Sequence, residues 1–227
     1  MNTFFRAAAA IAAKDLRSEM RTKEAFNASF AFSIVILVLF SFAFDPSSEE
    51  LRTISGGLLW LVYSFAGALV LNRSFARELQ NDCLDALVSA PVPVAAVFFG
   101  KVVANYFLLM IVETAALAVF SILYNTHFSA QFWPVVLVMF LGTWGMTVIG
   151  TMFSALTVNL RMREMMLPTL VYPLLVPALM AAMTLTSDLM NGTPLGGDNM
   201  IWLRVLAGFD FIYTVLAMVF IDIVLVG

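Results

Sequence analysis

Three polar residues lie within stretches that are otherwise apolar, and they are the first candidates for chemistry. Asn105 and Glu113 are eight positions apart, so a helix would place them roughly on one side and about two turns apart. An ionised carboxylate is costly in hydrocarbon unless it faces a polar interior or takes up a proton. The pair therefore predicts a polar seam between helices, with a protonated packing role for Glu113 as an equal alternative. Asp210 is a third intramembrane candidate without an obvious partner.

The sequence predicts no catalytic centre and no metal site. No GxxxxGKS/T phosphate loop occurs, because Gly100 and Lys101 lack the upstream glycine and the following hydroxyl residue that would hold phosphates and magnesium. No His, Asp or Glu cluster has metal-ligand or acid–base spacing. Cys83 is the only cysteine, which excludes an internal disulfide. If ATP drives this protein, another chain must hydrolyse it.

The elements that must position these residues are membrane helices. The chain is 62% hydrophobic and only 12% charged, so most of its surface must meet lipid. A helix needs about 20 apolar residues to cross about 30 Å of hydrocarbon. We expect an all-α bundle of six transmembrane helices in a single domain, residues 1–227. The candidate spans are 26–44, 55–71, 102–124, 132–158, 167–186 and 202–226.

The basic residues predict the orientation of the bundle. Only Arg52 and Arg204 fall on one side, whereas ten fall on the other, so the positive-inside rule places both termini in the cytoplasm of a bacterial inner membrane. Trp133 and Trp202 then lie at the outer interface. No cleavable signal peptide is expected. The ten residues are Arg6, Lys14, Arg17, Arg21, Lys23, Arg73, Arg77, Lys101, Arg161 and Arg163.

Two segments outside the spans have helical spacing. Residues 5–24 predict an amphipathic helix at the inner membrane surface, with an apolar face from Phe5 to Met20 and a basic face around Lys14. Residues 72–101 predict a cytoplasmic loop with a short coupling helix that ends at a proline break and transmits force from a partner. An ordinary lipid-surface helix is the alternative. The expected interface residues are Arg77, Glu78, Asp82, Leu84, Asp85, Leu87 and Pro91.

The fourth and fifth spans carry residues that affect helix packing. Glycines at 142, 145 and 150 and threonines at 143, 147 and 151 predict a close-packing face, within the chain or between two copies. In the fifth span, Pro168 suits a helix start, whereas Pro173 and Pro177 predict a bend.

Several motifs, taken in order, resemble the CcmB family of haem exporter permease subunits. Leu-Asn-Arg-Ser-Phe-Ala-Arg-Glu at 71–78 is followed by Leu-Asp-Ala-Leu-Val-Ser-Ala-Pro-Val-Pro at 84–93 and Phe-Phe-Gly-Lys at 98–101. Further similarities are Lys-Asp-Leu-Arg-Ser-Glu-Met-Arg-Thr-Lys-Glu at 14–24, Tyr-Pro-Leu-Leu-Val-Pro at 172–177 and Gly-Phe-Asp at 208–210. Asn-Asp-Cys at 81–83 departs from the Asp-Gly that is common in the family.

The resemblance implies a type-2 exporter-like permease of an ATP-binding-cassette complex in cytochrome c maturation. Its implied partners are a cytoplasmic ATPase at the coupling helix, sister membrane subunits and a chaperone that handle haem, and a second copy of the chain. It implies no bound cofactor, with haem as a handled ligand, and no nucleic-acid partner. A permease for lipid-linked sugars or drugs and a membrane assembly scaffold remain alternatives.

The only histidine, His127, is placed in a short outer loop where a haem ligand could lie. A single loop histidine is more often an ordinary surface residue, so we favour that interpretation. The fourteen methionines, including Met165 and Met166, are better explained as adaptable packing than as axial ligands.

Reporter fusions test the predicted topology. Fusions after Pro46, His127 and Gly192 are expected to report the outer side, and fusions after Gln80 and Arg163 the cytoplasmic side, because basic residues are retained in the cytoplasm. Alkaline phosphatase and green fluorescent protein activities measure the two sides. Reversed signals at two of these five sites would contradict the six-span topology.

Overall fold

The computed structural model describes residues 2–45, 48–80, 92–126, 131–157, 160 and 163–226, and within them it is all-helical. Six helices are long and apolar enough to span a membrane, which confirms the expected multi-pass helical bundle. They are α2 (Glu24–Ala43), α3 (Glu49–Leu71), α6 (Val94–Leu123), α7 (Phe132–Thr157), α8 (Arg163–Met190) and α9 (Asn199–Val226).

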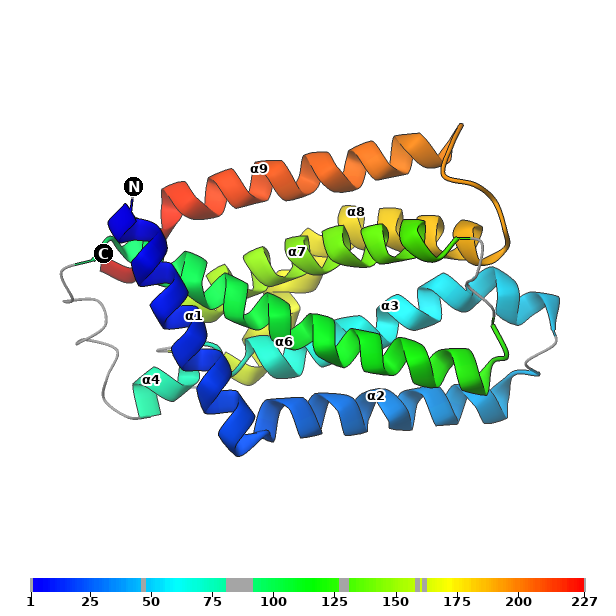
Figure 1. The fold of residues 1–227 in the computed structure, drawn as a ribbon, viewed down its shortest axis with the longest axis horizontal. Helices are drawn as coiled ribbons and strands as arrows, with labels where there is room; N and C mark the ends of the chain where they lie inside the picture. Colours follow the sequence, from blue (N-terminus) through cyan, green and yellow to red (C-terminus); the bar gives the residue numbers. More distant parts are fainter. Residues whose placement is uncertain are drawn as a thin grey trace.

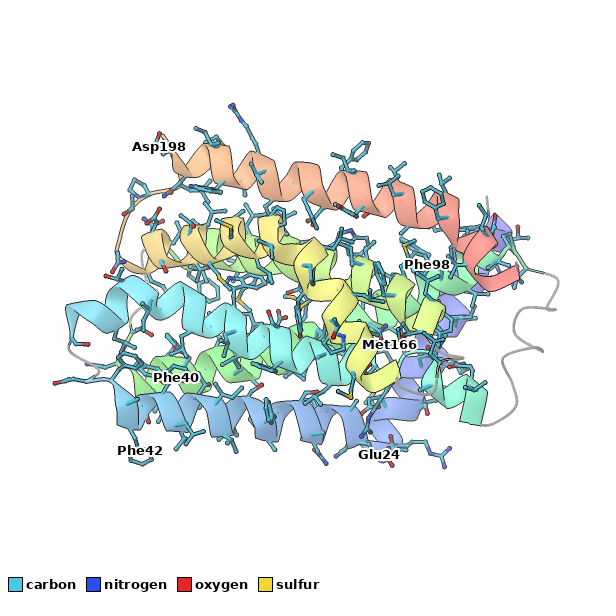
Figure 2. The ribbon with its side chains drawn as sticks, turned by 180° about the vertical axis from the view of Figure 1, so that it is seen from behind. Glu24, Phe40, Phe42, Phe98, Met166 and Asp198 are labelled. Atoms are coloured by element: carbon cyan, nitrogen blue, oxygen red, sulfur yellow. The ribbon has the colours of Figure 1, made fainter. Side chains whose placement is uncertain are left out.

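Two further helices lie at one end of the bundle. The helix α1 (Asn2–Thr22) runs across the end of the six long helices, and the short α4 (Ala76–Gln80) lies near it, as do both chain termini (Figure 1). Phe42 and Asp198 lie at the opposite end from α1, whereas Glu24 and Met166 lie toward it (Figure 2). The arrangement agrees with alternating spans, because the predicted cytoplasmic elements share one end.

A sharp corner separates α1 from α2. Lys23 adopts a left-handed backbone conformation with φ 54°, which ends α1 and turns the chain. The buried carboxylate of Glu19 accepts hydrogen bonds from the backbone N–H groups of Ala25 and Phe26, at 2.8 and 3.0 Å. It therefore caps the first turn of α2, where N–H groups have no partner within the helix.

The helix α7 lies at the centre and packs against α3, α6, α8 and α9. Its glycines contact two different helices of the same chain: Gly142 and Gly150 meet α3 at Trp60 and Leu71, whereas Gly145 meets α9 at Asp210. The close-packing face predicted for the fourth span therefore works within the chain, where small residues allow close approach of helices.

Two predicted helix boundaries are wrong. The third span begins at Val94, directly after Pro93, and not at residue 102, so Lys101 belongs to α6 and not to a loop. A lysine lowers local hydropathy, and this moved the predicted boundary. The fifth span begins at Arg163, so Pro168 lies inside α8 together with Pro173 and Pro177. The ribbon of α8 changes direction along its length, as expected for a helix with interior prolines (Figure 2).

Replacing Gly142 by alanine tests the central packing. The new methyl carbon would lie closer than 3.0 Å to three atoms of the Trp60 indole, which is held in place by a hydrogen bond from its Nε1 to Thr186. We expect a loss of about 1–3 kcal/mol in unfolding free energy. Thermal unfolding in detergent measures it, with Gly57→Ala as the control because its methyl group would meet no atom within 4 Å. Equal melting temperatures for the two variants would contradict this packing account.

Candidate functional site

A cluster of four charged side chains joins α1, α4 and α6. The Nζ of Lys101 donates hydrogen bonds to the backbone oxygen of Ser74, to Oε1 of Glu78 and to Oδ2 of Asp15, at 2.7, 2.8 and 3.2 Å. All three N–H donors of the ammonium thus have partners. Lys101 is only 1% exposed, and its Nζ lies 4.7 Å from the centre of the Phe75 ring.

Lys14 completes the cluster from α1. Its Nζ lies 2.9 Å from Oε1 of Glu78 and 3.0 Å from Oδ1 of Asp15, so two carboxylates balance two ammonium groups. Burial opposes the charged form of Glu78, but Lys101 and Lys14 outweigh it and hold the pKa of Glu78 below its ordinary value of 4.5. Burial likewise opposes the charge of Lys14, and Glu78 with Asp15 nevertheless raises the pKa of Lys14.

The ion cluster, whose centre is the buried pair of Lys101 and Glu78, connects α1, α4 and α6 directly. Removing one member of a buried pair leaves an uncompensated charge, so the elements that carry the charges resist separation. The backbone of α1 also approaches α6 closely at Gly100, where an added methyl carbon would lie 2.7 Å from the carbonyl oxygen of Ala8. Displacement of α4 should therefore move α1 and the adjacent end of α6.

The predicted coupling segment is described only in part. Among its expected interface residues, Glu78 is buried and faces Lys101 and Lys14, so its carboxylate holds α4 in place. The helix α4 contains Arg77, whose side chain lies outside the described part of the chain. Also outside the described residues are Asp82, Leu84, Asp85, Leu87, Pro91 and His127.

The N-terminal helix α1 has one exposed apolar side and one side packed against the bundle. Of the apolar face expected to meet lipid, Phe5 and Met20 are exposed, by 57% and 75%. Ala12, which was expected on the same lipid-facing side, is instead buried together with Ala8, and α1 packs on α6. The helix is thus anchored to the bundle by protein contacts, and its membrane-surface location stays a prediction.

A cavity of about 240 Å³ lies beside the ion cluster. Lys14, Asp15 and Glu78 line it together with Ser74 and Asn105. The Nδ2 of Asn105 donates to the hydroxyl of Ser74 at 2.8 Å and to that of Thr151 on α7 at 2.9 Å. Asn105 therefore connects the cavity with the interior of the bundle.

The two carboxyl candidates lie deeper between the helices. Glu113 is fully buried on α6, and the hydroxyl of Thr143 on α7 donates to its Oε2. Asp210 of α9 is 6% exposed and lies against Gly145 of α7. The structure thus brings Asn105, Glu113 and Asp210 against α7. Asn105 binds Thr151 of that helix, whereas Glu113 binds Thr143.

Sequence reasoning missed the ion cluster. Lys101 lies 86 residues from Asp15 and 23 from Glu78, so no local spacing links them. A lysine eight residues into a helix that starts directly after Pro93 was the available signal. No group of three or more potential metal ligands occurs among the residues that the structure describes.

Fold and site together define a multi-pass helical membrane protein with a charged junction at one end of its bundle. The family model of the CcmB protein matches residues 6–223. Three similar proteins carry the name "Heme exporter protein B". The protein of Rhodobacter capsulatus is 35% identical to this chain, and that of Paracoccus denitrificans is 31% identical; each alignment covers 75% of this chain and 78% of the relative. The protein of Pseudomonas aeruginosa is 26% identical, over 89% of this chain and 90% of the relative. The chain belongs to the CcmB family.

Replacing Lys101 by methionine tests the ion cluster. The variant removes the buried cation that binds Glu78 and Asp15, and it leaves the buried carboxylate of Glu78 with only the half-exposed Lys14, so we expect a loss of about 3–5 kcal/mol in unfolding free energy. Arg73→Met is the control, since Arg73 pairs with Glu24 at 3.1 Å where both side chains are exposed, and such pairs contribute less than about 1 kcal/mol. Denaturant titration in mixed micelles measures both variants. Similar losses would show that the cluster does not hold the helices together.

Proposed function

We propose that this chain is the transmembrane permease subunit of a haem exporter complex in c-type cytochrome maturation. The observation that carries the proposal is membership of the CcmB family over residues 6–223, together with six spanning helices. The relatives are named heme exporters, and a transporter subunit of this class is not itself a catalytic enzyme. The complex lies in the bacterial inner membrane, with both termini of this chain in the cytoplasm.

A separate cytoplasmic ATPase supplies the energy in this proposal. It docks on the segment from Arg77 to Pro91, and the conformational change of the ATPase is transmitted to the bundle through α4. The ion cluster supports this route, because Glu78 of α4 binds Lys101 of α6 and Lys14 of α1. A push on α4 is then shared by α1 and α6, which its Glu78 carboxylate contacts.

Haem is the cargo of the complex in this proposal and not a cofactor of the chain. Sister membrane subunits and a haem chaperone hold the haem, and a second copy of this chain completes a permease dimer of the type-2 exporter kind. The transmitted motion either moves haem across the membrane or releases the loaded chaperone from its assembly site. Both outcomes use the same coupling through α4.

Substitutions in the docking segment test the coupling. We expect Asp85→Ala combined with Leu84→Asp to lose ATPase binding or haem attachment to cytochrome c, while membrane abundance stays normal, because surface changes usually alter stability by less than about 0.5 kcal/mol. Glu78 is left unchanged, since its buried carboxylate pairs with Lys101. The measurements are immunoblots of membranes, co-purification of the ATPase and haem staining of cytochrome c.

Asp222→Ala is the matched control, because Asp222 is an exposed carboxylate near the same end of the bundle. It should retain both binding and maturation. If the docking-segment variant also retains both, the coupling proposal fails. Co-purification of a glycolipid-synthesis partner in place of a haem-handling subunit would instead favour the sugar or drug permease.

A further inference from the structure

A row of threonine hydroxyls runs along the inner side of α7. Thr143, Thr147 and Thr151 are fully buried and spaced by four residues, so successive side chains are about 6 Å apart along the helix. The hydroxyl of Thr147 donates to the backbone oxygens of Thr143 and Trp144, at 2.9 and 2.8 Å. The single proton of the Thr147 hydroxyl is therefore shared between two backbone oxygens of its own helix, and its lone pairs are free to accept; the hydroxyl must rotate before it can donate along the row.

The two ends of this row meet different surroundings. At one end Thr151 accepts from Asn105, which also contacts Ser74, and both Asn105 and Ser74 line the 240 Å³ cavity beside the ion cluster. At the other end Thr143 donates to Glu113. The row thus links a cavity at the α1 and α4 end of the bundle with a carboxyl group inside the membrane region.

Glu113 has a carboxyl oxygen that lacks a hydrogen-bond partner within the described part of the chain. Its Oε1 is buried and unpartnered, and the residue is 0% exposed. Around it, α3 contributes Tyr63, whose hydroxyl donates to the Glu113 backbone oxygen at 3.3 Å. Tyr106 of α6 interacts electrostatically with both Glu113 and Asp210 of α9, and α7 contributes Thr143 and no titratable group.

The described surroundings of Glu113 contain no cation that would balance a carboxylate. Its polar partners among the described residues are a threonine hydroxyl and, through its backbone, a tyrosine hydroxyl. Asp210, which also interacts with Tyr106, has two buried oxygens without partners among the described residues and supplies no positive charge. An isolated carboxylate in such a place is costly, so the group needs a proton from outside the cluster.

We propose that Glu113 is a proton-binding site that exchanges its proton with the cavity beside the ion cluster along the threonine row of α7. The proton comes from water in the cavity and returns to it, so nothing is oxidised or reduced. Asn105 and Thr151 form the entrance, and Thr147 and Thr143 lead to the carboxyl oxygen. The proposed route requires one water molecule between successive hydroxyls, because the gaps of about 6 Å are too long for a direct hydrogen bond. This proton site does not depend on the proposed cargo.

Infrared spectroscopy of the purified full-length chain in lipid nanodiscs tests for the proton. Wild type is expected to show a protonated-carboxyl C=O band that shifts after transfer from H2O to D2O, and Glu113→Gln is expected to lose it. Asp210→Asn identifies the contribution of the second carboxyl. The proposal is overturned if Glu113→Gln leaves the spectrum unchanged, which would mean that Glu113 is ionised, or if its band never shifts in D2O.

The path is tested by the rate of that shift. Thr147→Val and Thr151→Val, made separately, are expected to slow the deuterium shift of the Glu113 band at least about tenfold. Thr214→Val is the matched control, because its hydroxyl accepts from Trp144 Nε1 at 3.0 Å and lies outside the row. Persistence of the Glu113 band itself shows that a variant is folded. If either row variant keeps the band and exchanges as fast as the control, the threonine row is not the route.

Discussion

Inside hydrocarbon a polar side chain finds no water, so each one in this bundle needs a partner on another helix or in its own backbone. The indole of Trp60 on α3 donates to Thr186 on α8, and the hydroxyl of Tyr124, next to the end of α6, donates to the backbone of Leu37 on α2. Tyr172 of α8 donates to the backbone of Ser64 on α3. These bonds fix how each helix is rotated, because lipid and apolar side chains alone discriminate poorly between rotations.

The same constraint explains why the ion cluster around Lys101 differs from the region of Glu113 and Asp210. Lys101 is buried and has a partner for every donor, so its region is rigid and serves as a joint between helices. Glu78, Glu113 and Asp210 all have a buried carboxyl oxygen without a partner among the described residues, but only Glu78 is bound by cations there. A protein retains such groups at a cost in stability, which marks this second region as the one where ligands or protons can act.

The sequence was sufficient to predict six spanning helices, because length and hydropathy are local properties. It was insufficient where contacts join distant segments. Lys101 looked like a loop charge, since its partners Asp15 and Glu78 come from two other helices. Pro168 looked like a helix start, but α8 begins five residues earlier and tolerates the proline in its second turn. The left-handed conformation of Lys23 could not be predicted, because the position is not a glycine, the residue that usually marks positive φ.

The docking of α1 on α6 has a consequence for how the protein is made. The corner at Lys23 lets α1 stay outside the insertion channel while α2 enters it, yet its binding partners at Gly100 and Lys101 belong to a helix that ends at Leu123. At about 5–20 residues per second, the ribosome needs at least several seconds to synthesise the intervening hundred or so residues. Throughout this interval the nascent chain carries Asp15 on an amphipathic helix whose partner Lys101 is not yet in place, so α1 joins the bundle only after the third span has left the channel.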